Sequence, residues 1–245
     1  KESILRDVRN ALEELRTFMD IGEGTIEESE TEDKDWINNW KEFFHQFYVD
    51  DILIVPSWEE VKEEDKDKMI LHIDPGTAFG TGMHETTQLV IRQLKKYVTR
   101  GAEILDVGTG SGILGITALK LGAGHVVGTD LDPCAVSAVQ DNKEANQIED
   151  DSFDMMIGNI IDDVEVQNEV GYERYDIVAA NILADVLVPL TPVIVHQMKK
   201  GAYYITSGIL DVKEEVVREA VEKAGLTLVE VTKQGEWVCV TARKD

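Results

Sequence analysis

The stretch ILDVGTGSG, residues 104–112, decides the fold of this chain. It begins as a buried strand would, and three alternating glycines, Gly108, Gly110 and Gly112, lead from it into an apolar helical segment. Glycine lets the backbone turn sharply and lets a ligand approach closely. We therefore predict that this stretch forms a ligand-binding turn between a strand and a helix.

An acidic residue follows this turn at an informative distance. Asp130 ends the next predicted strand, residues 125–129. An acid about 20 residues beyond such a turn holds the two hydroxyls of an adenosine ribose. The alternative without a ligand is a tight turn with a capping aspartate. The turn and the acid together favour a nucleoside-containing cofactor.

Asp106, which stands just before the turn, bears on the identity of that cofactor. NAD would place its pyrophosphate at the N-terminus of the following helix, and a carboxylate beside that site opposes an anion. S-adenosylmethionine has no phosphate and carries a sulfonium and an ammonium, so we expect Asp106 near its ammonium. NAD stays open as the alternative because a literal G-x-G-x-x-G pattern occupies residues 110–115.

Strands and helices alternate regularly from residue 84 onward. Strands are expected over residues 103–107, 125–129, 153–157, 175–180, 202–206, 226–233 and 236–242. Helices are expected over residues 85–97, 111–121, 133–145, 184–198 and 212–224. This alternation predicts an α/β fold with a mostly parallel sheet, to which the hairpin of the last two strands adds an antiparallel edge.

The N-terminal part follows a different pattern. An amphipathic helix is expected over residues 2–19, an aromatic-rich segment with near-helical spacing over 35–47, and short strands over 52–55 and 69–73. A charged surface connector lies between those two strands. We find no internal repeat that would suggest a repeated architecture.

The composition bounds the partners of the chain. Its 245 residues carry a formal net charge of −24, which opposes broad binding to nucleic acid or anionic membranes and is compatible with a basic protein partner. The plainer reading is that the charge only keeps the protein in solution. The two cysteines, Cys134 and Cys239, form no disulfide framework and no zinc pattern, which suits a reducing cytosol. The longest apolar stretch, residues 182–195, is too short to span a bilayer.

Two further motifs carry candidate site residues. Residues 74–87, DPGTAFGTGMHETT, predict a donor-rich loop around Phe79 that closes over a small ligand, with Thr87 in the first turn of the next helix. A linker loop with a helix cap explains the same residues equally well. Asn181 follows a strand and could aim its amide at the cofactor or at an incoming amine, although a turn residue is the plainer reading. No constellation for metal, paired-carboxylate or serine–histidine chemistry accompanies them.

Together these segments resemble a known family. Residues 74–87, 105–115, 130–133 and 180–183 look like the ribosomal protein L-eleven (L11) methyltransferase family, PrmA, and residues 33–58 resemble the connection between its two domains. The resemblance implies a seven-stranded class I methyltransferase (Rossmann-like) sheet after a smaller N-terminal α+β domain. It also implies methyl transfer from S-adenosylmethionine to lysine and N-terminal amines of L11. From the charge and the cysteines we expect a cytoplasmic protein, with neither nucleic acid nor membrane as a direct partner.

The resemblance carries over to named positions. The cofactor-contacting positions of the family match Thr87, Gly108, Asp130 and Asn181, and we add Asp106, Gly110, Gly80 and Thr81 to the expected cofactor site. Asn181 and Phe79 are expected to be the catalytic residues, and no metal is expected.

We expect three parts along the chain. These are a partial substrate-recognition domain over residues 1–55, a linker over 56–73 and the methyltransferase domain over 74–245. The small domain of the family is longer than the segment present here, so we expect part of the substrate-recognition surface to be missing from this sequence. Another target of the same enzyme class is the alternative. Enzymes that methylate glutamine or adenine commonly carry Asn-Pro-Pro-aromatic, whereas Ile182 and Leu183 follow Asn181 here.

Overall fold

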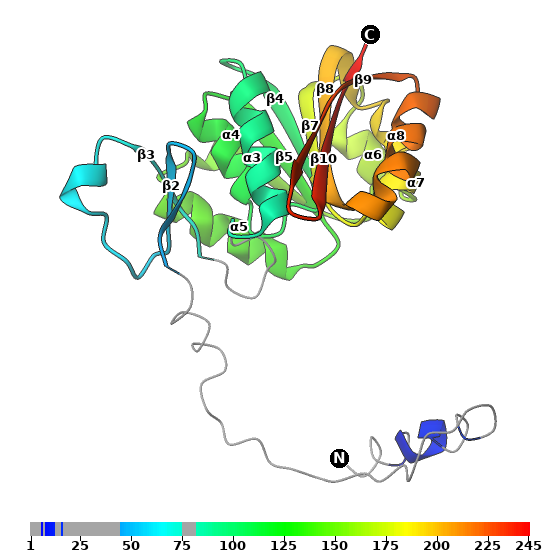
Figure 1. Cartoon of the computed structure of the whole chain (residues 1–245), viewed down its shortest axis with the longest axis horizontal. Coiled ribbons are helices and arrows are strands. Elements are labelled where there is room, and N and C mark those ends of the chain that lie inside the picture. Colours follow the sequence, from blue (N-terminus) through cyan, green and yellow to red (C-terminus); the bar gives the residue numbers. More distant parts are fainter. Residues whose placement is uncertain (1–5, 7, 13–15, 17–44, 75–81) are drawn as a thin grey trace. The chain divides into compact units, whose positions relative to one another are not determined.

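The computed structural model describes residues 6, 8–12, 16, 45–74 and 82–245 (Figure 1). The chain forms two compact units, residues 1–43 and residues 44–245. In the first unit, the described residues 8–12 are helical, as expected there. Residue 6 is helical as well, and residue 16 lies in a turn. The other residues of the expected helix, most of the aromatic-rich segment, and Phe79, Gly80 and Thr81 lie outside the described residues.

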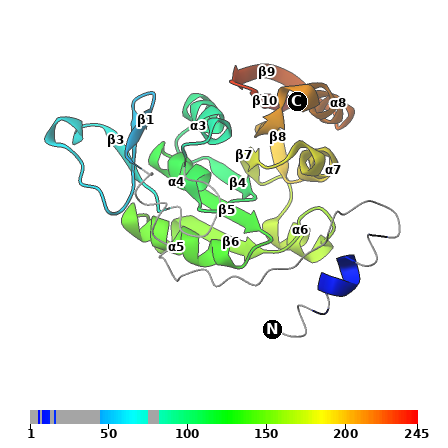
Figure 2. The ribbon, with the colours of Figure 1, turned by 60° about the horizontal axis from the view of Figure 1, so that its bottom comes forward.

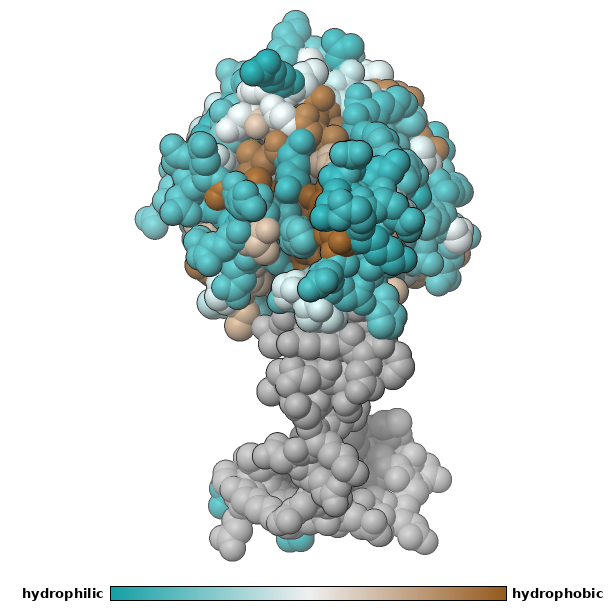
Figure 3. Space-filling model, turned by 90° about the vertical axis from the view of Figure 1, so that its left-hand side faces the viewer, coloured by the Kyte–Doolittle hydropathy of each residue, from teal (hydrophilic) through white to brown (hydrophobic). Residues whose placement is uncertain are grey.

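A small three-stranded sheet opens the second unit. Its strands β1 (Phe47–Val49), β2 (Ile52–Val55) and β3 (Met69–His72) lie in that order, with β1 antiparallel and β3 parallel to β2. The connection from β2 to β3 contains a short 3₁₀ helix, η2 (Glu63–Asp65). Ile54 and Leu71 are fully buried in the same apolar cluster as the helices that follow. The expected strands are confirmed to within one residue, whereas β1 replaces the end of the aromatic segment for which helical spacing was noted. Figure 3 shows that this side of the unit is mostly hydrophilic at its surface.

The main sheet has seven strands in the order β6-β5-β4-β7-β8-β10-β9, which confirms the predicted class I methyltransferase sheet. Its strands are β4 (Glu103–Val107), β5 (His125–Asp130), β6 (Phe153–Ile157), β7 (Tyr175–Asn181), β8 (Met198–Leu210), β9 (Leu226–Gln234) and β10 (Trp237–Lys244). The first five are parallel, and β10 runs antiparallel to β8 and β9. Strands β6 and β9 lie at opposite ends of the sheet (Figure 2).

The last hairpin inserts its second strand into the sheet. Strand β10 pairs with β8, and β9 becomes the outer edge. The side chains explain this order, because Val238, Cys239 and Val240 of β10 are buried in succession, whereas β9 alternates exposed and covered residues. A strand that is apolar on both faces gains most from a central position. Gly235, with a φ of +59°, forms the two-residue turn between the strands.

Helices cover both faces of the main sheet. Apolar residues of α3 (Glu85–Tyr97), α4 (Ile113–Lys120) and α5 (Cys134–Ala145) join one buried cluster. Residues of α6 (Val164–Val170), α7 (Ala184–Ile194) and α8 (Glu214–Lys223) join the other. The sheet and its two helical layers form a three-layer arrangement. Because β4 to β8 run parallel, their carboxyl ends lie at one edge of the sheet.

Some helix boundaries differ from the expected ones. Helix α7 continues through Pro189 and Pro192 and ends at Ile194 rather than at residue 198, because Met198 already pairs with Tyr175 of β7. Helix α8 begins at Glu214 because a 3₁₀ turn, η4 (Asp211–Lys213), precedes it.

Helix α6 was not expected at all, although its start carries a recognisable signal. The Asp163 carboxylate accepts backbone hydrogen bonds from Glu165 and Val166, as an N-terminal cap does. None of the described helices combines the length and the apolar character needed to cross a bilayer.

Candidate functional site

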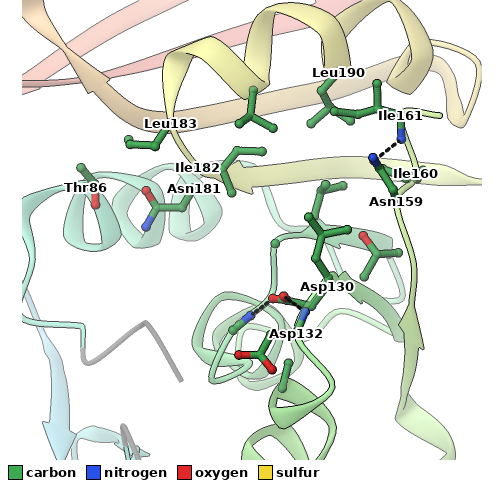
Figure 4. Close-up of a pocket in the computed structure, with 18 of the residues that line it drawn as sticks. Thr86, Asp130, Asp132, Asn159, Ile160, Ile161, Asn181, Ile182, Leu183 and Leu190 are labelled. Atoms are coloured by element: carbon green, nitrogen blue, oxygen red, sulfur yellow. Dashed lines mark hydrogen bonds between the residues drawn. The ribbon is translucent and has the colours of Figure 1, made fainter. Parts of the chain in front are cut away.

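A cavity of about 740 Å³ lies at the carboxyl edge of the main sheet (Figure 4). The ends of β4, β5, β6 and β7 form its floor, and the start of α3 and Trp237 of β10 complete the wall. Ligands of open α/β sheets bind at this edge, where the strand order reverses between β4 and β7. The cavity therefore lies where the sequence predicted a binding site.

The glycine-rich turn after β4 contributes backbone rather than side chains to this cavity. Gly108 and Gly110 both line it, with φ angles of +73° and +54° that side-chain-bearing residues rarely adopt. A Cβ on Gly108 would lie 2.5 Å from Cγ2 of Ile182. The Gly108 N–H donates to the Thr129 carbonyl over 2.8 Å, which ties the turn to β5. Glycine is thus required by both conformation and space.

Asp130, at the end of β5, connects the two loops that border the cavity. Its Oδ2 accepts a hydrogen bond from the Gly110 N–H over 2.8 Å, and its Oδ1 accepts one from the Asp132 N–H over 2.9 Å (Figure 4). Asp130 also lines the cavity. The carboxylate is therefore held in one orientation before any ligand binds.

Asp106 lies beneath the turn and not on the cavity wall. It is fully buried, and its Oδ2 accepts hydrogen bonds from the Thr109 hydroxyl over 2.8 Å and from the Gly115 N–H over 3.2 Å. Burial raises the pKa of this carboxyl to about 6, against the two hydrogen bonds that lower it. These two hydrogen bonds hold the turn and the start of α4 together, while the Asp106 Oδ1 has no hydrogen-bond partner among the described residues. The place of Asp106 near the cofactor ammonium stays a prediction.

Asn181, at the end of β7, faces the cavity and is held from behind by Thr87. The Asn181 Nδ2 donates to the Thr87 hydroxyl oxygen over 3.1 Å, and Thr87 is buried in the first turn of α3. The Asn181 Oδ1 is buried and has no hydrogen-bond partner among the described residues. Buried polar atoms are nearly always paired, so this oxygen marks where a donor of a ligand would be accepted.

Other residues of the wall received no role from the sequence, although His84, Leu131 and Leu183 lie within the motifs quoted above. His84 caps α3, where its Nδ1 accepts from the Thr86 N–H over 3.3 Å, and its ring meets Trp237 edge-on at 4.8 Å. Both rings line the cavity. Leu131 and Leu183 line it too, although each is 68% exposed. Trp237 carries no local motif, since it reaches the site only because β10 inserts beside β8.

The chemistry of the wall distinguishes between cofactors. Apolar side chains dominate it, and Asp130 and Asp132 are its carboxylates. Among the described residues that line the cavity, none is a lysine or arginine. Such a wall suits an uncharged base with a ribose and a cationic tail, and it offers no counter-ion for a pyrophosphate. Within the described part of the chain, no three His, Cys, Asp or Glu side chains are grouped as metal ligands.

Comparisons with known proteins agree with this geometry. The family model "Ribosomal protein L11 methyltransferase (PrmA)" matches residues 1–245. The chain belongs to this family. A ribosomal protein L11 methyltransferase from Agathobacter rectalis is 56% identical over 247 residues, which cover 100% of this chain and 76% of that protein.

Solved structures support the same family and fold. The crystal structure of a ribosomal protein L11 methylase from Lactobacillus delbrueckii subsp. bulgaricus matches with a TM-score of 0.73 and 31% identity, over 82% of this chain and 100% of that one. A geranyl diphosphate C-methyltransferase from Streptomyces coelicolor, solved with S-adenosyl-L-homocysteine, shares the fold at 12% identity. Its TM-score is 0.53, over 63% of this chain and 78% of that one.

Proposed function

We propose that this member of the L11 methyltransferase family transfers methyl groups from S-adenosylmethionine to lysine and N-terminal amines of ribosomal protein L11. The unpartnered Oδ1 of Asn181 carries the proposal, because it faces the same cavity as Asp130. The Asp130 carboxylate is suited to accept hydrogen bonds from ribose hydroxyls, and the Asn181 Oδ1 is suited to accept one from an N–H donor. The family membership supports both the cofactor and the protein target.

The residues divide the work of binding in this proposal. Asp130 accepts hydrogen bonds from the ribose hydroxyls, and the backbone at Gly108 and Gly110 allows close approach of the cofactor. Asp132 and the apolar residues after β5 and β6 enclose the base. Thr87 acts through Asn181, and Phe79, Gly80 and Thr81 are proposed to close the site from the loop before α3.

Methyl transfer to nitrogen asks the protein mainly for positioning. S-adenosylmethionine supplies a methyl group on a sulfonium, whose sulfur is a good leaving group. Lysine has an ordinary pKa of about 10.4 and attacks only after losing a proton. An apolar cavity disfavours the ammonium and lowers that pKa, so the proton is released to solvent before attack. Asn181 then accepts an N–H of the neutral amine and directs its lone pair toward the methyl carbon.

The remaining parts of the proposal concern the whole protein. Residues 1–55 would contribute to substrate recognition, residues 56–73 would link, and residues 74–245 would hold the methyltransferase site. A ribosomal substrate implies that the protein works in the cytoplasm. The high negative charge suits a basic protein substrate rather than nucleic acid or a membrane surface.

Calorimetric titration with S-adenosylmethionine tests the cofactor site. We expect micromolar binding by the wild type and about 30-fold weaker binding by Asp130→Ala, because hydrogen bonds to a carboxylate contribute about 2 kcal/mol. Asp141→Ala, an exposed carboxylate on α5, is the matched control and should bind like the wild type.

Mass spectrometry of recombinant L11 after incubation with the enzyme and cofactor tests the target. Methylated lysines and a methylated N-terminus are the expected products. Cofactor binding without methylation of L11 would redirect the search to another target of this enzyme class. A folded chain that binds NADH and not S-adenosylmethionine would overturn the cofactor assignment.

A further inference from the structure

An apolar surface continues outward from the cavity along the starts of α7 and α8. Leu183 and Val186 line the cavity and are 68% and 40% exposed, and Val212 and Val216 are 82% and 42% exposed. Leu183 directly precedes α7 and Val186 lies in its first turn. Val212 lies in η4, directly before α8, and Val216 lies in the first turn of α8. We call these four residues the α7–α8 patch.

Contacts between the two helices bring the two pairs together. Helices α7 and α8 lie side by side (Figures 1 and 2). The Lys213 Nζ, one residue beyond Val212, donates to Oδ1 of Asp185 over 3.0 Å. Both helices follow strands that end at the carboxyl edge, so the patch and the cavity open at the same edge of the sheet.

Carboxylates surround the patch. Asp185, Asp211, Glu215 and Glu236 are all exposed. The Asp211 N–H donates to the Glu236 carbonyl over 2.9 Å, which places both residues next to Trp237 on the cavity wall. Asp185 and Glu215 are paired with Lys213 and Arg218. Asp211 and Glu236 are the carboxylates of this group that have no ion pair among the described residues. An apolar centre with an acidic rim is complementary to a segment that carries both apolar and basic side chains.

The net charge of the chain favours a basic protein over a second copy of this chain as the partner that covers the patch. A second copy would bring the same net charge of −24 to the patch, which opposes self-association. A basic protein is attracted by the same field. The target amine must also reach the cavity from outside, and the patch is continuous with the cavity wall at Leu183 and Val186.

We propose that the α7–α8 patch docks the lysine-bearing segment of the basic protein substrate. Apolar side chains next to the target lysine pack on Val212 and Val216, while the lysine itself enters the cavity beside Asn181. This inference rests on the proposed function, and it assigns to the catalytic unit a part of the substrate recognition that does not depend on residues 1–55.

Steady-state kinetics of the full chain with recombinant L11 tests this surface. The double variant Val212→Ser/Val216→Ser removes apolar contact without adding charge, and neither residue lines the cavity. We expect its KM for L11 to rise about tenfold, as for the loss of a central apolar contact in an interface. Its kcat at saturating L11 and its calorimetric Kd for S-adenosylmethionine should stay at wild-type values.

Two control variants separate docking from general surface effects. Val229→Ser changes a valine on the outer strand β9 that is about as exposed as Val216, and it should leave every constant unchanged. Val212→Leu/Val216→Leu keeps the apolar contact and should retain the wild-type KM.

Each remaining outcome is decisive. An unchanged KM in an active serine variant would overturn the docking surface and leave the proposed function standing. A wild-type dimer in light scattering that the serine variant dissociates would assign the patch to a second copy and overturn the proposal. If the wild type neither binds nor methylates L11, both the substrate and its docking surface fall.

Discussion

The glycine-turn half of the cavity, at the ends of β4, β5 and β6, differs from the Asn181 half, at the end of β7 and the start of α3. In the first half, both oxygens of Asp130 already accept hydrogen bonds from Gly110 and Asp132. In the second half, Asn181 uses its Nδ2 on Thr87 and keeps its Oδ1 without a described partner. Each Asp130 oxygen thus accepts one backbone hydrogen bond and keeps a further lone pair for a ligand, whereas the Asn181 Oδ1 accepts none from the described residues.

The difference indicates which property each half controls. Hydrogen bonds from the protein's own backbone rigidify the Asp130 half, and their loss costs stability and cofactor affinity. An acceptor without a partner in the protein contributes little to the free energy of folding. Its removal should instead lower turnover, because a donor of the ligand is no longer oriented. Substitutions in the two halves should therefore separate stability from turnover.

The largest effect is expected for Asn142, which anchors the glycine-turn half from α5. Its Oδ1 accepts from the Asp74 N–H over 2.7 Å, and its Nδ2 donates to the carbonyls of Asp74 and Ser111 over 3.1 and 2.9 Å. We expect Asn142→Ala to lower the free energy of unfolding by about 3 kcal/mol, because it leaves buried backbone groups without partners. Denaturant titration measures this loss.

A matched control exists on the same helix. Gln140 is exposed and bonds only Glu144 on the surface, so Gln140→Ala should change the free energy of unfolding by less than about 0.5 kcal/mol. Equal losses of unfolding free energy in the two variants would show that Asn142 does not stabilise the glycine-turn half of the cavity.

Turnover is the property expected to respond at Asn181. We expect Asn181→Ala to lower kcat by about 100-fold, as for the removal of one positioned polar group, while the Kd for S-adenosylmethionine changes by no more than about twofold. Asn168→Ala, on the exposed side of α6, is the control and should keep the wild-type kcat. The reverse result, a weakened Kd with kcat retained, would assign the open Oδ1 to the cofactor rather than to the amine.

A smaller, pH-dependent effect is expected for Asp106. Its pKa is about 6 in the folded chain against an ordinary value of 3.8, and burial is the main cause. A carboxyl with a raised folded pKa binds its proton more tightly when folded, so its contribution to stability is present at low pH and is lost as the pH rises through about 6. We expect the stability of Asp106→Asn relative to wild type to improve by about 2 kcal/mol between about pH 4 and about pH 8.

Thermal or denaturant unfolding across that range provides the measurement. Asp141→Asn on the surface of α5 serves as the comparison and should show no such trend. A difference between Asp106→Asn and wild type that does not vary with pH would show that the carboxyl titrates as an exposed one.

Local patterns were enough to predict much of the fold. The alternation after residue 84 predicted the strands and most helices, because a buried parallel strand and an amphipathic helix each leave a periodic apolar signature. The glycine turn and Asp130 were found because both follow strands at short, regular spacing. Helix α6 was missed since its seven residues are too few for a clear period, although its Asp163 cap was visible.

Long-range packing decided the rest. Asp106 and Asp130 are both acids next to glycines in the sequence, yet burial turns the first into a structural anchor and the edge position leaves the second on the cavity wall. Trp237 reaches the site because β10 inserts between β8 and β9, an order that adjacent residues do not specify. The need for glycine at position 208 is likewise set by tertiary packing, since a Cβ added there would lie 2.3 Å from the Ile182 carbonyl oxygen.

The sequence by itself determined the α/β class, the glycine turn, the acid at the end of β5 and the resemblance to the methyltransferase family, because each depends on residues close together in the chain. Only the tertiary structure decided which side chains meet in the cavity, which acid is buried beneath it, and that an apolar patch continues from it along α7 and α8. Those properties depend on contacts between segments far apart in sequence, and on the water that such contacts exclude.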